Sequence, residues 1–243
     1  SADDLARLSS TETNTYLSPV FDTIRQVKAQ LSDDVALLGF AGSPWTVATY
    51  MVEGKTSRDF MQTKIWARED PEGFDRLLAL LVAATSNYLI SQIDAGADAV
   101  QLFDTWAGVV PADQFVRCVI APTRQIIDNV RAEKPDAKII GFPRGIGPAV
   151  AQYAITTGVN GVGIDSALSP AYAAETLQPA FAVQGNLDPV TLLVGGKSMF
   201  NSAAAIIEAL SDGPFIFNLG HGVIPQTPPA HVKALAEFIR SGV

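Results

Sequence analysis

The 243-residue chain is predicted to adopt an α/β fold, a (β/α)8 barrel of which about six of the eight strand–helix units can be located. Three observations predict this class. Short apolar runs alternate with longer amphipathic segments. The runs are apolar almost throughout, as in strands of a parallel sheet covered by helices. Each run ends in small, polar or aromatic residues, where barrel enzymes carry their active sites.

Six apolar runs are predicted to be strands, at residues 35–40, 97–103, 137–142, 161–164, 181–184 and 215–218. Apolar residues at helical spacing predict helices at residues 12–31, 112–133, 148–157, 170–177, 199–210 and 227–240. A further long helix opens at Asp70-Pro71, where proline suits the first helical position, and stops at Gly96. The order of these segments is the strand–helix alternation of a barrel.

An open doubly wound sheet is the alternative architecture, and it would carry a dinucleotide or phosphate loop. Ser166 stands where a dinucleotide fingerprint at Gly161 needs its third glycine, and Thr49 stands where a phosphate loop ending at Thr56 needs its first. The barrel is therefore preferred, as a single domain over residues 1–243. Because only six units are found and the opening helix follows no strand, either two units escape detection or the amino-terminal part of the barrel is absent.

Composition limits the function further. With 48% hydrophobic and 17% charged residues, the chain has the make-up of a globular protein with one large core. A net charge of −8 disfavours binding to nucleic acid or to a membrane surface. The amino-terminal residues lack the pattern of a signal peptide, which predicts a cytoplasmic location. The single cysteine, Cys118, excludes an intramolecular disulfide and a multi-cysteine metal cluster, and is expected in the core.

Polar residues at the predicted strand ends are the candidates for function. His221 lies between Gly220 and Gly222 after the last strand, where a bare backbone lets a large substrate approach and imidazole can be charged or neutral near pH 7. The alternative is a histidine that caps the barrel rim. Arg144 is the only arginine at a predicted strand end and is a candidate for carboxylate binding, or else forms a surface ion pair. His231, in the closing helix, is expected to be solvated.

Four residues in the longer motifs have two interpretations. Tyr50 either contributes its hydroxyl to a site or is a partly buried tyrosine bonded to a neighbour. Thr105, which precedes Trp106, either presents a hydroxyl or caps a helix. Phe40 and Phe103 are either lining residues or core residues at strand ends.

Four motifs carry a family resemblance: GFAGSPWTVATYMVEG (39–54), QLFDTWAG (101–108), VQGNLDP (183–189) and FNLGHGVIPQTPPAHV (217–232). In this order they resemble the uroporphyrinogen decarboxylase family over essentially the whole chain. The resemblance implies a TIM barrel matched from its third strand onward. The family's amino-terminal arginine motif and strand-end aspartate have no counterpart here, which agrees with the two units that are not found.

The resemblance also implies the chemistry. The family consists of carboxy-lyases that remove the carboxyl groups of the four acetate side chains of uroporphyrinogen, giving coproporphyrinogen in haem biosynthesis, without metal or other cofactor. The substrate's own pyrrole is the electron sink. By this resemblance Tyr50 is the tyrosine near the catalytic aspartate, Thr105 is a site hydroxyl, and His221 meets a substrate carboxylate. Phe40 and Phe103 line the cleft. The family forms homodimers.

Several alternatives remain open at this point. Because the family's catalytic aspartate and arginine motif are missing, the chain alone is expected to be inactive or poorly active. An inactive tetrapyrrole-binding fragment is one alternative. Related corrinoid methyltransferases hold zinc with a histidine and two cysteines, which this chain lacks. A sugar-phosphate barrel enzyme is disfavoured because no glycine-rich phosphate loop follows the last strands.

Overall fold

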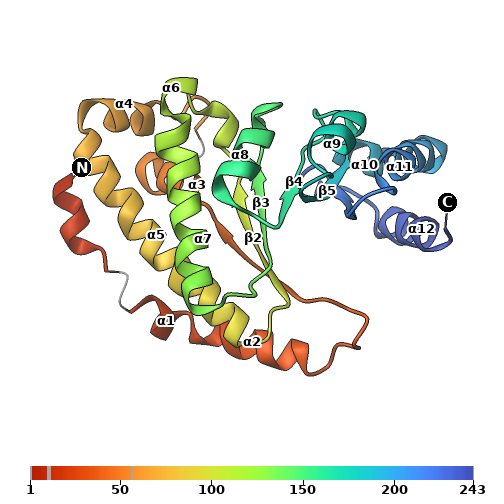
Figure 1. Ribbon diagram of the computed structural model, residues 1–243, viewed down its shortest axis with the longest axis horizontal. Coiled ribbons are helices and arrows are strands. Elements are labelled where there is room, and N and C mark those ends of the chain that lie inside the picture. Colours follow the sequence, from red (N-terminus) through yellow and green to blue (C-terminus); the bar gives the residue numbers. More distant parts are fainter. Residues whose placement is uncertain (1, 10–11, 56, 243) are drawn as a thin grey trace. The chain divides into compact units, whose positions relative to one another are not determined.

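The computed structural model describes residues 2–9, 12–55 and 57–242 of the chain. They cluster into two compact units, and each is described by itself. The first unit comprises Ser1–Arg144 with Ile155–Val159, and the second comprises Gly145–Ala154 with Asn160–Val243. Within the described residues each unit holds three neighbouring parallel strands that alternate with helices (Figure 1). The predicted α/β class is therefore confirmed.

The first unit carries strands β1 (Leu38–Gly42), β2 (Ala99–Asp104) and β3 (Ile139–Pro143). Its α-helices are α1 (Thr13–Tyr16), α2 (Ser18–Lys28), α3 (Pro44–Glu53), α4 (Met61–Glu69), α5 (Pro71–Asp94), α6 (Ala112–Phe115) and α7 (Ala121–Glu133). Two 3-10 helices, η1 (Ala2–Arg7) and η2 (Ala107–Val109), and a π-helical segment, η3 (Val116–Ile120), complete it.

The second unit carries strands β4 (Gly161–Gly163), β5 (Ala182–Leu187) and β6 (Phe215–Leu219). Its helices are α9 (Pro170–Thr176), α10 (Pro189–Val194), α11 (Gly196–Leu210) and α12 (Pro229–Arg240), and α8 (Ala149–Thr157) contributes residues to both units. Strand register places Asn186 of β5 beside Asn218 of β6. The strand ends on which the sequence places polar groups therefore lie at one edge of this sheet.

Strands of the first unit are buried as a helix-covered parallel sheet requires. All five residues of β3 are buried, as are four of the six in β2. In Figure 1, α5 and α7 run side by side, and the side chain of Asn129 in α7 donates a 3.1 Å hydrogen bond to Ser86 in α5. Register pairs Phe103 with Phe142, so the ends of β2 and β3 bring two aromatic side chains together.

Helix α5 is long and apolar enough, by length and composition alone, to cross a membrane. Its buried side chains include Phe74, Leu77 and Leu89, each no more than 1% exposed. This face packs within the first unit, with Phe74 in edge contact with Trp45 of α3 and Trp66 of α4. The packing identifies α5 as the central helix of this unit.

Two predicted helices are interrupted, in both cases at a proline. The helix expected over residues 12–31 is broken at Leu17, because Pro19 occupies the first turn of α2 and restricts the backbone before it. The helix expected over 112–133 contains the π-helical segment η3. Pro122 has no N–H to give to the carbonyl of Cys118 four residues earlier, and the wider turn of η3 lies at that place.

Gln92 of α5 completes the hydrogen bonding of β1 at Phe40. Its side-chain oxygen accepts from the Phe40 N–H at 2.9 Å, and its side-chain nitrogen donates to the Phe40 carbonyl at 3.0 Å. Gln92 itself is only 2% exposed. The amide therefore takes the place of a neighbouring strand at this residue and fixes where Phe40 lies.

Replacing Gln92 with leucine is expected to lower the free energy of unfolding by about 1–3 kcal/mol, because both backbone groups of Phe40 lose their partner. Urea unfolding followed by circular dichroism measures this change. The matched control is Gln125→Leu, which alters an exposed glutamine of α7. Equal stability of the two variants would contradict the assigned role of Gln92.

Candidate functional site

An aromatic row crosses the ends of the three strands of the first unit. The ring of Phe103 meets Phe40 edge to face with centroids 5.9 Å apart, and it meets Phe142 in the same way at 5.9 Å. Phe142 is buried, whereas Phe40 is 62% exposed. The row therefore begins in the core and ends at the surface, and it offers apolar ring edges and faces to a flat ligand.

Tyr50 is presented by α3, which follows β1 directly. Its side chain is 55% exposed, and within the described residues its hydroxyl has no hydrogen-bond partner. Tyr50 is therefore not the partly buried, hydrogen-bonded tyrosine of the alternative interpretation. The helix starts with Pro44 at its first turn and ends at Gly54, whose φ of 63° is the left-handed conformation that glycine adopts readily.

Thr105 lies in the turn that follows β2, and its side chain is half-buried. The short helix η2 begins after it, with Trp106 at the N-cap and no side-chain capping bond. Thr105 is therefore not a helix cap. Its hydroxyl has no partner among the residues that the structure describes, so it can donate to or accept from a ligand.

Asp104, between Phe103 and Thr105, is a functional candidate that the sequence did not reveal. Its side chain is fully buried at the end of β2, and burial raises the pKa of this carboxyl to about 7 although a hydrogen bond from Thr46 opposes the effect. The Thr46 hydroxyl donates to one carboxylate oxygen at 2.6 Å. A carboxyl group with a raised pKa at the end of a strand is a feature of enzyme sites.

Arg144 follows β3 immediately. Its backbone N–H donates to the carbonyl of Asp104 at 3.1 Å, and its own carbonyl accepts from the N–H of Gly108 at 2.9 Å. These bonds fix the backbone beside the end of β2. In the described part of the chain the guanidinium group forms no ion pair, so the alternative of a surface ion pair is not observed. The positive charge is available to a carboxylate ligand.

His221 belongs to the second unit and follows β6 in an exposed bend. The N–H of the preceding residue, Gly220, donates to the carbonyl of Leu187 at 2.8 Å. Gly220 also lies against the backbone of Ser166, with no space for a side chain between them. The backbone that carries His221 is therefore tied to the ends of β5 and β4.

The six predicted site residues thus fall into two groups. Five of them, Tyr50, Thr105, Phe40, Phe103 and Arg144, lie at or just beyond the strand ends of the first unit. The sixth, His221, lies in the second unit. Phe40 and Phe103 lie within β1 and β2, and the other four residues lie in segments that follow the carboxyl ends of strands.

The prediction for His231 was wrong. The residue is half-buried in α12, and its Nδ1 lies 3.1 Å from the carbonyl oxygen of Leu192. A Cβ at Gly195 would come within 2.5 Å of the imidazole Cε1. His231 is therefore a packing residue that joins α12 to the end of α10, and the apolar pattern of α12 gave no sign of this contact.

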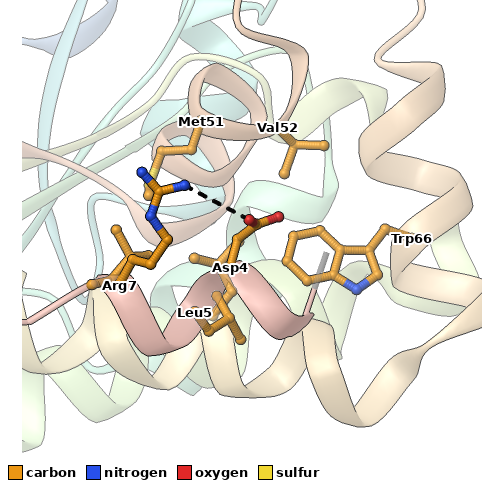
Figure 2. A pocket seen from close by; sticks show the side chains of 8 residues that line it. Asp4, Leu5, Arg7, Met51, Val52 and Trp66 are labelled. Carbon is orange, nitrogen blue, oxygen red and sulfur yellow. Dashed lines mark ion pairs between the residues drawn. The ribbon is translucent and has the colours of Figure 1, made fainter.

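A cavity of about 480 Å3 lies elsewhere in the first unit. Figure 2 shows its walls, which include Asp4, Leu5, Arg7, Met51, Val52 and Trp66. Asp4 and Arg7 pair with each other at 4.0 Å, and both are largely exposed. None of the predicted site residues lines this cavity, and its charges already have partners.

Cys118 is confirmed as a core residue. It is 1% exposed, and burial raises the pKa of its thiol to about 11, so the thiolate that zinc binding requires is disfavoured. Among the described residues, no three His, Cys, Asp or Glu side chains are grouped as metal ligands. The residues therefore do not fit a zinc-dependent methyl-transfer site.

Parallel strands each followed by a helix, with aromatic, hydroxyl and cationic side chains at the strand ends, define a barrel-type enzyme. The comparisons make the class specific. A family model described as uroporphyrinogen decarboxylase (URO-D) matches residues 1–242. The chain belongs to this family of carboxy-lyases, as its motifs predict.

The curated relatives support this assignment. The chain is 46% identical over 238 residues to "Uroporphyrinogen decarboxylase" of Rhodospirillum rubrum, covering 98% of this chain and 68% of that protein. It is 45% identical to the protein of the same name from Mesorhizobium japonicum, covering 98% and 69%. The chain therefore spans about two thirds of the length of these relatives.

Two solved structures share the fold. A "methyltransferase from Methanosarcina mazei" matches with a TM-score of 0.76 at 20% identity, covering 91% of this chain and 63% of that one. A B12-independent methionine synthase from Shewanella sp. matches with a TM-score of 0.57 at 12% identity, covering 91% and 66%. At these identities the likeness shows the fold alone.

Proposed function

We propose that this chain carries part of the tetrapyrrole site of a cofactor-independent decarboxylase that converts uroporphyrinogen to coproporphyrinogen. Family membership supports the reaction. Two observations support the site. Among the described residues, the hydroxyls of Tyr50 and Thr105 and the guanidinium of Arg144 have no hydrogen-bond or ion-pair partner. They lie in segments that follow the three strands carrying the aromatic row, to which Phe40 and Phe103 belong. Uroporphyrinogen combines apolar pyrrole rings with carboxylates on its rim, so its binding needs both aromatic and polar contacts.

In this reaction the protein has to position the substrate and to take part in proton transfer. Protonation of a pyrrole ring carbon creates a cationic electron sink. The bond between the acetate CH2 and its carboxylate then breaks, carbon dioxide leaves, and the bonding electron pair moves into the ring system. Addition of a proton to the CH2 carbon and loss of the proton from the ring restore the pyrrole and leave a methyl group. Each of the four acetates undergoes the same exchange of carbon dioxide for a proton.

Each proposed residue has a place in this scheme. Phe40 and Phe103 contact the macrocycle, and Arg144 binds a rim carboxylate by a charge-assisted hydrogen bond. Thr105 donates its hydroxyl to a second polar group of the substrate. Tyr50 lies beside the reacting acetate, where its hydroxyl can orient the carboxylate and take part in proton transfer. His221 binds a further carboxylate.

An acidic chain binds a polyanion only where positive charge is concentrated. The net charge is −8, so Arg144, free of ion pairs among the described residues, is the cationic group that the first unit offers at its strand ends. The family's arginine motif, for which the sequence shows no counterpart, supplies more. We therefore propose that the chain alone decarboxylates weakly and that the family's amino-terminal region restores the rate.

Substituting Tyr50 with phenylalanine is expected to reduce kcat/KM by roughly 100-fold, because the hydroxyl acts in proton transfer. Anaerobic conversion of uroporphyrinogen, followed by chromatography of the oxidised products, measures the rate for the chain alone and for the chain restored at its amino terminus. Tyr16→Phe is the matched control, since Tyr16 is 74% exposed on α1.

Three outcomes separate the possibilities. Turnover by the restored form with loss in Tyr50→Phe alone supports the proposal. Equal rates for the chain alone and the restored form would contradict the expected need for the amino-terminal region. Tetrapyrrole binding without turnover in either form would identify a binding fragment and overturn the assignment of a decarboxylase.

We also propose that the protein is a cytoplasmic homodimer. The family forms dimers through the barrel rim, and the sequence has the charge and composition of a globular protein. Sedimentation equilibrium of the restored form tests the dimer. A monomer at micromolar concentration would contradict it.

A further inference from the structure

The buried carboxyl of Asp104 is a polar group that the proposed reaction leaves unused. Asp104 is 0% exposed, and it stands between two proposed site residues, Phe103 and Thr105. One carboxylate oxygen accepts from the Thr46 hydroxyl at 2.6 Å. The other oxygen is buried without a partner in the described part of the chain. A buried carboxyl with one oxygen left without a partner costs stability, so its presence points to a role in geometry.

Thr46 connects this carboxyl to the helix that presents Tyr50. It lies in the first turn of α3, and Tyr50 lies four residues later on the same face of the helix. The Thr46 hydroxyl donates to Asp104 and also accepts from the backbone N–H of Trp106 at 3.1 Å. A single hydroxyl therefore binds the residues on both sides of Thr105.

Further bonds join the same two segments. The indole N–H of Trp45 donates to the Trp106 carbonyl at 3.0 Å, and the N–H of Ser43 donates to the Phe103 carbonyl at 2.8 Å. The ring of Phe60 packs against Trp106 with centroids 4.9 Å apart. Hydrogen bonds thus fix the start of α3 against the end of β2 and the turn that follows it, and Phe60, just before α4, packs on the same turn.

We infer that Asp104 and Thr46 are positioning residues that hold Tyr50 and Thr105 in their relative places for the substrate. They act through α3 and the turn after β2, and neither touches the substrate. This inference rests on the proposed function of Tyr50 and Thr105. Two apolar side chains of similar volume could pack at this place without leaving any polar group unsatisfied. The inference explains why a carboxyl–hydroxyl pair is found there instead.

The test compares three substitutions in α3 of the restored, active enzyme. Thr46→Val keeps the volume but removes the hydroxyl from both Asp104 and Trp106. Thr46→Ser keeps the hydroxyl and is the rescue variant. Thr49→Val is the matched control, because Thr49 is 0% exposed in the same helix but its hydroxyl donates to the Thr46 carbonyl at 2.7 Å and not to β2.

Thr46→Val is expected to lower kcat by roughly 10- to 100-fold with little change in KM, since misplacement of about 1 Å has effects of this size and the charged contact to Arg144 remains. Thr46→Ser and Thr49→Val are expected to stay within about threefold of the parent. Rates are measured at temperatures where circular dichroism shows all variants folded. Equal losses in Thr46→Val and Thr49→Val, or no loss in either, would overturn the inference.

A second readout separates this inference from the proposed function. The indole N–H of Trp45 gives its own nuclear magnetic resonance signal, and its hydrogen bond to Trp106 slows exchange with solvent. Faster exchange in Thr46→Val but not in Thr49→Val supports the connection even if the parent shows no turnover, in which case the proposed function fails by itself. Unchanged exchange in Thr46→Val overturns the connection.

Discussion

Replacing Gly220 with alanine is expected to remove most decarboxylase activity, by roughly 100-fold in kcat/KM, because the backbone before His221 has to move. A Cβ at Gly220 would overlap the backbone nitrogen of Ser166 and lie 2.9 Å from its Cα. Contacts this short with backbone atoms are not relieved by a change of rotamer. Either the loop after β4 or the loop after β6 must shift.

The loop after β4 resists such a shift. The Asp165 carboxylate accepts from the N–H of Gly145 at 2.6 Å and from the N–H of Ala167 at 2.9 Å. The side chain of Asn186 in β5 donates to the carbonyls of Asp165 and Leu168 at 2.9 and 2.7 Å. Because Ser166 lies within this network, the segment carrying His221 is the part that moves.

Overpacking of this kind costs about 1–3 kcal/mol, so the melting temperature of the Gly220→Ala variant is expected to fall by roughly 3–10 °C. Gly222→Ala is the matched control, since it flanks His221 on the other side and a Cβ there meets no atom within 4 Å. Calorimetry and the decarboxylation assay are run on both variants. Full activity of Gly220→Ala below its melting temperature would contradict a role for His221 in substrate binding.

The sequence predicts the strands well because their signal is local. All six apolar runs are strands, although all of them except β4 extend farther toward the carboxyl end than predicted. The added residues include Asp104, Pro143 and Leu187, two of which are poor strand formers. Neighbouring strands, and not intrinsic preference, hold these residues in the sheet.

Helix α3 was not predicted, because its buried residues do not follow the helical spacing of an apolar stripe. Five of its residues are buried, and they include threonines as well as Trp45, so no apolar stripe stands out. The start at Ser43-Pro44 and the stop at Gly54 were the usable signals. Asp104 escaped for another reason: its partner Thr46 is 58 residues away, and no local pattern pairs the two.

The stability of the protein is expected to depend on pH through Asp104, by up to about 4 kcal/mol. In the fold the pKa of this carboxyl is raised to about 7 by burial, against an ordinary value of 3.8. Between pH 4 and pH 7 the folded state therefore binds more protons than the unfolded state. The contribution of Asp104 is most favourable below pH 4, falls as the pH rises through this window, and is constant above it.

Asp104→Asn isolates this contribution because asparagine does not titrate. The free energy of unfolding of the parent minus that of the variant is expected to decrease by up to about 4 kcal/mol between pH 4 and pH 7.5. The neighbouring Cys118 thiol, with its pKa raised to about 11, stays neutral throughout and does not contribute. Urea unfolding at half-unit pH intervals gives the two curves.

Asp98→Asn is the control of opposite sign. A hydrogen bond from Lys28 holds the pKa of Asp98 below its ordinary value, so its contribution is present at neutral pH and is lost as the pH falls. The Asp98→Asn variant keeps Asp104, so the contribution of Asp104 to its free energy of unfolding is still expected to decline between pH 4 and pH 7. Parallel curves for the parent and Asp104→Asn would mean that Asp104 ionises in the fold as readily as in water. In that case the carboxyl is solvated, and a buried connection between Asp104 and Thr46 is excluded.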